Sequence, residues 1–206
     1  NDLHLYAHSE IQNYLAQQIK FLYPEDIPFK IVYHPLNFRK EQLIYEDKAV
    51  TIYSFPLDHR IPTCGFRFEE KPVLPNLIPE KLKEYNIPIR NRQAIKEGAD
   101  FITGDGRVIA NSELIVNKHK ARTFAFCSDT RYNESYIESV SNVDLLYHEA
   151  TFASDNQALA QTTFHSTGED AARVASQAKV GKLIIGHFSA RYKDHTQILK
   201  EATAIF

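Results

Sequence analysis

The sequence predicts an α/β fold in which helices pack on a sheet. In the second half of the chain, short segments rich in β-forming residues alternate with segments whose apolar residues recur at helical spacing. The chain has 206 residues, 43% apolar and 24% charged, which is typical of a globular domain with a sizeable core. A proline-containing stretch from residue 71 to about residue 120 interrupts the alternation and predicts an insertion.

The first part of the chain begins with a predicted helix and continues as strands. Ile11, Leu15 and Ile19 lie on one face of a helix over residues 9–22, and Ser9 is its predicted N-cap. Segments rich in β-branched and aromatic residues predict strands at 29–33, 49–57 and 66–68. Within the insertion, the sequence predicts a short helix at 79–85 and a turn at 104–106.

The part that follows the insertion alternates between strand and helix. The strands are predicted at 122–127, 143–147 and 182–186, and the helices at 134–140, 169–178 and 196–205. Each of these strands ends close to a polar residue, so polar side chains are expected where strands meet loops.

Composition excludes several classes of protein. No apolar run reaches the roughly 18–20 residues that span a bilayer, and no signal sequence is apparent, so we expect no membrane association. Two cysteines, Cys64 and Cys127, are too few for a disulfide framework; both are expected to be buried packing residues in a cytoplasmic protein. The chain contains no Met and begins with Asn, so we expect it to be part of a longer protein.

Three residues that follow strands have the chemistry of metal ligands. His59, Asp129 and His187 supply imidazole and carboxylate groups, which zinc prefers, and loops at one sheet edge bring distant residues together. Taken singly, each has a simpler explanation, since a lone His is commonly structural and Asp commonly caps a turn. The sequence therefore predicts a shared site only when the three are considered together.

His165 precedes a predicted helix N-terminus. Ser166 and Glu169 match a capping box, with Ser166 as N-cap, and the free amides of such a helix start attract phosphate. The same helix dipole disfavours the imidazolium form of His165, but a neighbouring carboxylate such as Glu149 would offset it. His165 could then donate a proton, although a purely structural capping box remains an alternative.

Five segments in this order resemble the ribonuclease Z family, zinc-dependent endonucleases that trim the 3′ end of precursor tRNA. They extend over nearly the whole chain: Pro56-Leu57-Asp58-His59-Arg60-Ile61-Pro62, Phe126-Cys127-Ser128-Asp129-Thr130-Arg131, His148-Glu149-Ala150-Thr151-Phe152, His165-Ser166-Thr167 and Gly186-His187-Phe188-Ser189-Ala190-Arg191-Tyr192. The resemblance implies a metallo-β-lactamase-like αββα sandwich, partial because its first half is absent, with an inserted arm. Residues 1–71 and 121–206 would form the core and 72–120 the arm.

The resemblance also implies a role for each candidate residue. His59 would bind one zinc, His187 the other, and Asp129 would bridge the two. Glu149 and His165 would form a proton-handling pair that serves the leaving oxygen. Three further residues are expected at the substrate phosphate: Ser189, Arg191 and Thr167.

In the family, the arm grips the elbow of the tRNA, away from the active site, and two subunits form a homodimer. The resemblance therefore implies RNA contacts for the basic residues of the insertion: Lys81, Lys83, Arg90, Arg92 and Lys96. A second basic group occupies residues 118–122. On charge alone, with a net charge of −2, solvated surface is the favoured interpretation of both groups, and only the resemblance favours RNA contacts.

The family's His-x-His-x-Asp-His segment does not occur in these 206 residues. In the family it supplies four ligands and an aspartate that assists the attacking water. Three ligands cannot hold two zinc ions, so we expect the 206 residues to be inactive by themselves and to form the C-terminal part of the enzyme. Two alternatives remain: a hydrolase of small phosphodiesters or esters, and a non-catalytic RNA-binding half.

Overall fold

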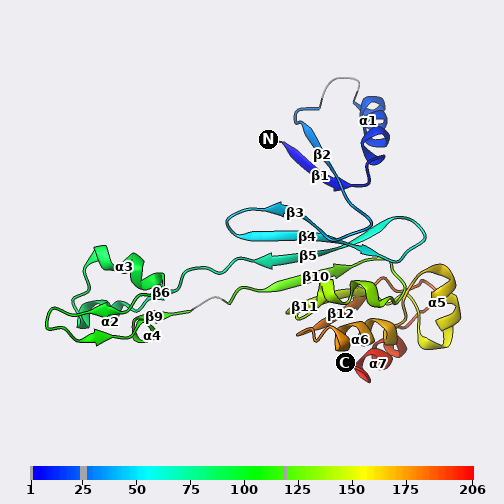
Figure 1. Cartoon of the computed structure of the whole chain (residues 1–206). Coiled ribbons are helices and arrows are strands. Elements are labelled where there is room, and N and C mark those ends of the chain that lie inside the picture. The colour runs from blue at the N-terminus through cyan, green and yellow to red at the C-terminus, as the bar shows by residue number, and fades with distance from the viewer. Residues whose placement is uncertain (1, 24–26, 118–119) are drawn as a thin grey trace. The chain divides into compact units, whose positions relative to one another are not determined.

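The computed structural model describes residues 2–23, 27–117 and 120–206 (Figure 1). Residues 118 and 119 of the second basic group lie outside the described residues. The chain divides into two compact units. The first unit consists of Asn1–Glu69 and Arg122–Phe206, and the second of Glu70–Ala121.

A six-stranded sheet forms the centre of the first unit, with the strand order β12-β11-β10-β5-β4-β3 (Figure 1). Strands β10, β11 and β12 run parallel to one another, whereas β5 is antiparallel to β10 and β3 is antiparallel to β4. Their bounds are β3 Gln42–Glu46, β4 Val50–Leu57, β5 Thr63–Glu70, β10 Thr123–Cys127, β11 Leu145–Glu149 and β12 Leu183–Gly186. The mixed α/β class predicted from the sequence is confirmed.

The two faces of this sheet differ because side chains alternate along each strand. One face buries Ala125, Cys127 and Leu146 completely, packed in one cluster with Val174 and Ala175 of helix α6. The opposite face carries aromatic residues that stack in pairs across strands and stay partly exposed. The pairs are Phe68 with Phe124 and Phe126 with Tyr147.

Helices α6 (Gly168–Gln177) and α7 (Thr196–Thr203) pack against each other, and α6 also contacts β11 and β12. The N-cap of helix α6 lies one residue later than the sequence suggested, although the helix itself begins at Gly168 rather than at residue 169. Thr167, not Ser166, is the N-cap, and Asp170 rather than Glu169 closes the capping box. The hydroxyl of Ser166 instead donates to the Thr130 carbonyl, which removes it from the helix end.

Helix α1 (Ile11–Leu22) follows strand β1 (Leu3–Ala7), which pairs in parallel with β2 (Ile31–Pro35). The helix was predicted, but the Ser9 cap was wrong: Glu10 occupies the N-cap and makes no side-chain cap bond. Residues 134–140 form two 3-10 turns, Glu134–Tyr136 and Glu138–Val140, in place of the predicted helix. A third 3-10 turn and a helix, not predicted, precede His165: Ser154–Asn156 and α5 Gln157–Thr163.

The second unit has a hydrophobic cluster of its own, built from Ile87, Ile95, Phe101, Ile109 and Leu114. Helices α2 (Pro79–Glu84) and α3 (Ile89–Lys96) contribute to it. The remaining elements are short: β6 Asn76–Leu77, β7 Phe101–Ile102, β8 Val108–Ile109, α4 Asn111–Leu114 and β9 Ile115–Val116.

Among the described residues, no helix is both long and apolar enough to cross a bilayer. Cys64 and Cys127 are both free thiols and both buried, as predicted. Burial raises the pKa of the Cys64 thiol to about 11 and that of Cys127 further. Neither thiol is therefore ionised or reactive at neutral pH.

Candidate active site

Four strands of the first unit end beside candidate site residues. His59 follows β4, Asp129 follows β10, Glu149 is the last residue of β11, and His187 follows β12. Because β10, β11 and β12 are parallel, their carboxyl ends lie at the same edge of the sheet. The edge therefore collects acidic and imidazole side chains on rigid elements.

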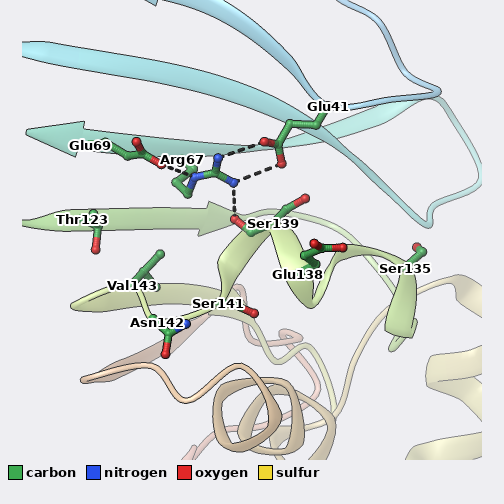
Figure 2. A pocket seen from close by; sticks show the side chains of 10 residues that line it. All are labelled: Glu41, Arg67, Glu69, Thr123, Ser135, Glu138, Ser139, Ser141, Asn142 and Val143. Atoms are coloured by element: carbon green, nitrogen blue, oxygen red, sulfur yellow. Dashed lines mark hydrogen bonds and ion pairs between the residues drawn. The ribbon is translucent and has the colours of Figure 1, made fainter.

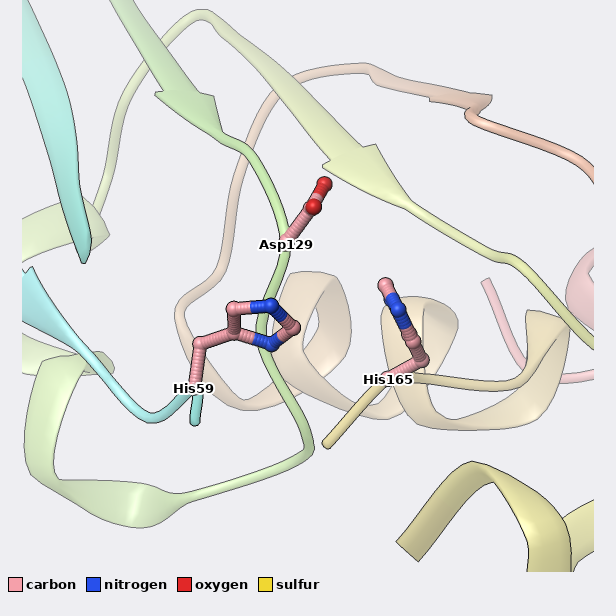
Figure 3. A group of neighbouring side chains, drawn as sticks. All are labelled: His59, Asp129 and His165. Atoms are coloured by element: carbon pink, nitrogen blue, oxygen red, sulfur yellow. The ribbon is translucent and has the colours of Figure 1, made fainter. Parts of the chain in front are cut away.

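His59, Asp129 and His165 come together at this edge. Each offers one ligand atom, and these atoms all lie within 4.8 Å of one another. A second group with the same spacing contains Glu149, His165 and His187. Figure 3 shows that the first three side chains come from separate segments and point toward a common space. His165 belongs to both groups and links them.

The ring of His59 is oriented by a backbone carbonyl. Its Nδ1 lies 2.9 Å from the carbonyl oxygen of Phe164, and because a carbonyl only accepts, Nδ1 is the donor. Phe164 ends helix α5 in the left-handed conformation, with a φ of 60°, which places that carbonyl beside His59. Nε2 of His59 therefore carries the lone pair that a metal could use.

Glu149 is completely buried, yet both of its oxygens accept hydrogen bonds. Oε1 accepts from the Thr130 amide at 3.0 Å and from His165 Nδ1 at 2.7 Å. Oε2 accepts from the amide of Thr151 at 3.0 Å and from its hydroxyl at 2.7 Å. Burial opposes ionisation, but the bonds from His165, Thr151 and Thr130 outweigh it and lower the pKa of Glu149.

His165 has the opposite shift. The hydrogen bond to Glu149 raises the pKa of the imidazole, although burial acts against the charged form. Its ring lies 5.1 Å from the ring of His59 and 5.4 Å from that of His187, measured between centroids. With Nδ1 held by Glu149, the other ring nitrogen faces the shared space, and the raised pKa favours the protonated form that could donate from it.

His187 is held by a strained backbone. Its φ of 61° lies in the left-handed region, which few non-glycine residues adopt. At the preceding residue, Gly186, an added Cβ would lie 2.5 Å from the hydroxyl of Tyr147, so a larger residue there would require the Tyr147 ring to move. In this conformation Nδ1 of His187 lies 2.9 Å from the Thr151 hydroxyl, and Nε2 lies 3.4 Å from Oδ1 of Asp129.

The donor set of this edge fits zinc. His59 presents a lone pair on Nε2, and His187 and Asp129 face each other with an imidazole nitrogen and a carboxylate oxygen. Zinc in proteins is bound by imidazole, carboxylate or thiolate groups. The first two are present at this edge, whereas the thiol of Cys127 is buried within β10 and is not part of the group. His59, Asp129 and His187 would hold the metal from this chain.

The residues expected at the substrate phosphate lie in two different settings. Arg191 is exposed and Ser189 half-buried, on the loop that follows His187. Thr167 is completely buried, and its hydroxyl donates to Gln157 Oε1 while accepting from the Asp170 amide. Its hydroxyl is therefore committed to the helix N-terminus, and the expected phosphate contact of Thr167 is incompatible with this structure.

The basic residues of the insertion lie on two helices of the second unit. Helix α2 carries Lys81 and Lys83, and α3 carries Arg90, Arg92 and Lys96. Lys83 and Arg90 are exposed, whereas Lys81 forms an ion pair of 2.7 Å with Glu84. Nε of Arg92 is buried, so this guanidinium is only partly available to a ligand.

Sequence reasoning assigned no role to Thr130, Thr151 or the Asp58–Arg131 pair. The Arg131 guanidinium donates to Asp58 at 2.8 Å and lies 4.3 Å from the centroid of the Phe164 ring, so it braces the segment after β4 that contains His59. Burial opposes ionisation of Asp58, but bonds from Arg131 and Asn133 lower its pKa. The only sequence signal for these residues was their position inside the segments that also contain His59, Asp129 and Glu149.

A separate pocket of about 560 Å³ lies in the first unit and is lined by a structural ion-pair network (Figure 2). The Arg67 guanidinium donates to Glu41 at 2.9 and 3.1 Å, to Glu69 at 2.7 Å and to the Ser139 carbonyl at 2.6 Å. It also lies 4.6 Å from the centroid of Tyr53. The Arg67 guanidinium is therefore committed to contacts that join β5 to the 3-10 turns and to the segment before β3.

Curated relatives resemble the chain over its whole length. It is 42% identical over 204 residues to the ribonuclease Z of Phocaeicola vulgatus, covering 99% of this chain and 66% of that protein. It is 40% identical over 205 residues to the ribonuclease Z of Bacteroides fragilis strain YCH46, covering 100% of this chain and 67% of that protein. The chain thus spans about two thirds of the length of these relatives. No family model matches it.

Solved structures share the fold. The short form of human tRNase Z matches with a TM-score of 0.61 at 20% identity, over 93% of this chain and 62% of that one. A metallo-β-lactamase fold protein of Bacillus subtilis matches with a TM-score of 0.60 at 16% identity, over 100% of this chain and 60% of that one. The predicted metallo-β-lactamase-like fold is confirmed. The identity and coverage of its curated relatives show that the chain belongs to the ribonuclease Z family.

Proposed function

We propose that the protein is a zinc-dependent endoribonuclease that removes the 3′ trailer of precursor tRNA by two-metal phosphodiester hydrolysis. The observation that carries the proposal is the convergence of His59, Asp129 and His165 at one sheet edge, in a chain that is 40–42% identical to ribonucleases Z. We propose two zinc ions per complete subunit. Further ligands are needed beyond His59, Asp129 and His187, so the 206 residues by themselves are proposed to be inactive.

The residues of this chain divide the chemistry among them. Bound zinc would supply a water of lowered pKa and stabilise negative charge on the phosphate. His165, charged through its bond to Glu149, would donate a proton to the leaving oxygen. Glu149 would stay ionised throughout, because four donors hold its carboxylate. Ser189 and Arg191, on the loop after His187, would contact the phosphate.

We propose that the second unit binds the body of the tRNA. Lys83 and Arg90 are the best candidates because both are exposed. Lys81, Arg92 and Lys96 would add to the positive charge of the same two helices, α2 and α3. We further propose a homodimer, which sedimentation of the full-length protein would test, and a cytoplasmic location consistent with two free buried cysteines.

The decisive experiment compares two substrates with the full-length protein. Precursor tRNA with a 3′ trailer should be cut at one position, and a chromogenic phosphodiester should be hydrolysed far less efficiently. Turnover of the small ester alone would instead indicate a small-substrate hydrolase. RNA binding without any turnover, together with no bound zinc in metal analysis, would indicate a non-catalytic RNA-binding protein.

Asp129→Ala in the full-length protein should abolish cleavage of both substrates but leave tRNA affinity largely unchanged. The reason is that Asp129 lies in the candidate metal group, whereas the exposed basic residues lie in the second unit. Asp155→Ala is the matched control, since it removes an exposed carboxylate from the same unit. A parallel loss of tRNA binding in Asp129→Ala would contradict the assigned role.

A further inference from the structure

Thr151 lies at the junction of three candidate site residues. It follows Glu149 by two positions and is 7% exposed. Its hydroxyl oxygen is 2.7 Å from Glu149 Oε2 and 2.9 Å from His187 Nδ1. It is also 3.3 Å from Nδ1 of His165, whose shorter contact is the one of 2.7 Å with Glu149.

The direction of these bonds follows from counting protons. Both oxygens of Glu149 already accept a backbone N–H, one from Thr130 and one from Thr151 itself, so this carboxylate acts as an acceptor. A threonine hydroxyl has one proton, and its shortest contact with an acceptor is the one to Glu149. The lone pairs of the hydroxyl remain for His187, so Nδ1 of His187 must be the donor.

The consequence lies on the far side of the ring. With its proton on Nδ1, neutral His187 carries its lone pair on Nε2, which is the atom that faces Asp129 Oδ1 at 3.4 Å. Two electron-pair donors that face each other suit a cation between them. The opposite tautomer would direct an N–H at Asp129 and would have no lone pair to offer on Nε2.

We propose that Thr151 is a positioning residue whose single hydroxyl proton fixes the tautomer of His187 and thereby prepares its Nε2 as a metal ligand. The metal-binding role of His187 in this inference rests on the proposed function. The position of the proton on the His187 ring does not depend on any RNA substrate. Thr151 contacts His187 directly and reaches His165 through Glu149. One hydroxyl therefore helps to orient both the proposed metal ligand and the proposed proton donor.

The test uses the metal-free full-length protein labelled with ¹⁵N. Long-range ¹H–¹⁵N spectra of the histidine side chains at mildly alkaline pH should identify Nδ1 as the protonated nitrogen of His187. Thr151→Val, which keeps the shape but removes the hydroxyl, should shift His187 toward the Nε2-protonated form. Thr151→Ser should restore the wild-type pattern. Thr130→Val is the matched control, because it removes a completely buried hydroxyl whose partners are Asp58 and the Arg131 carbonyl.

Zinc affinity gives the second readout. Thr151→Val should bind zinc about 10- to 100-fold more weakly than the wild type, and Thr151→Ser should recover most of the loss. An Nε2-protonated His187 in the wild-type protein would overturn the proposal, whether or not any variant folds. An equal tautomer shift in Thr130→Val would also overturn it, because packing would then be the cause. If the tautomer results hold but precursor tRNA is not cut, only the proposed function fails.

Discussion

At the scale of single residues, hydrogen bonds decide which charged groups the protein can bury. Glu149 stays ionised with no exposed surface because four donors replace its water. Arg67 is satisfied in the same way by Glu41, Glu69 and the Ser139 carbonyl. In both places some of the partners lie far apart in sequence: Thr130 and His165 for Glu149, and Glu41 and Ser139 for Arg67. Each charge therefore joins separate segments of the chain and is stabilised by them.

Glu41 links this stability to pH. Burial opposes its ionisation, but hydrogen bonds from Arg67 and Ser139 and the charge of Arg67 lower its pKa below the usual 4.5. Because the pKa is lowered in the folded protein, the stabilisation is complete above pH 4.5 and is lost as pH falls below it.

Glu41→Gln should therefore lower the free energy of unfolding at pH 7 by about 1 kcal/mol or less, since the pair is partly exposed. Below pH 4.5 its stability should fall less steeply than that of the wild type. Urea unfolding at a series of pH values measures both effects. Identical pH slopes for the two proteins would contradict the assignment.

At the scale of elements, the ends of strands and helices position the site. Strands β10, β11 and β12 deliver Asp129, Glu149 and His187 to one edge because they are parallel. Helix α5 contributes through its last turn, where Phe164 offers a carbonyl to His59. The start of α6 is equally constrained, because Gly168 packs directly on the backbone of α7.

Gly168→Ala should destabilise the protein by about 1–3 kcal/mol, because the added Cβ would lie 2.6 Å from the carbonyl oxygen of Ile198. The change would separate α6 from α7 and is measurable as a drop in thermal or urea stability. Gly104→Ala is the control, since nothing lies within 4 Å of its added Cβ. Equal stabilities for the two variants would refute the close packing of the helices.

Helices α2 and α3 give the second prediction at this scale. Reversing the charge of Lys83 and Arg90 with glutamate should raise KM for precursor tRNA, while hydrolysis of a chromogenic phosphodiester stays unchanged. Removing two phosphate contacts should also reduce the slope of log affinity against log salt by roughly 2.

The matched control reverses Lys182 and Lys200 of the first unit, both exposed, and changes the net charge equally. It should leave KM close to the wild-type value. If both double variants bind tRNA equally weakly, overall charge rather than the second unit governs binding. If the Lys83 and Arg90 variant also hydrolyses the chromogenic phosphodiester more slowly, the proposed RNA-binding role of the arm is wrong.

At the scale of the whole molecule, each of the two units has a hydrophobic core of its own among the described residues, and the first unit has a further small cluster where α6 meets α7. The core of the first unit combines β4, β10, β11 and α6 around Phe55 and Leu146. The core of the second unit uses only its own residues, from Ile87 to Leu114. A unit of this size buries little apolar surface, so its stability is expected to be the lower of the two.

Leu114→Ala removes a completely buried side chain from the second core and should cost about 2–5 kcal/mol there. Hydrogen exchange should then accelerate throughout residues 70–121 and remain slow in β10 and β11. Leu146→Ala is the matched control in the first core and should produce the reverse pattern. Uniform acceleration in both variants would show that the units unfold as one.

The sequence predicted most elements of the sheet, because β-forming runs ending in polar residues are local signals. Among the elements it missed are β1, β3, α3 and α5, and it placed the cap of α6 at Ser166 instead of Thr167. The cap was misplaced because the Ser166 hydroxyl bonds to Thr130, a partner 36 positions away that no local pattern reveals.

The sequence by itself determined the family, the class of fold and the group of residues at the strand ends. All three can be inferred from local periodicity and short motifs, which depend only on the order of residues along the chain. Only the tertiary structure decided that Thr167 is buried and that Thr151 contacts His187 across 36 positions. The physical reason is that burial and hydrogen-bond direction depend on which loops meet at the sheet edge, and that meeting is fixed by packing rather than by any one segment.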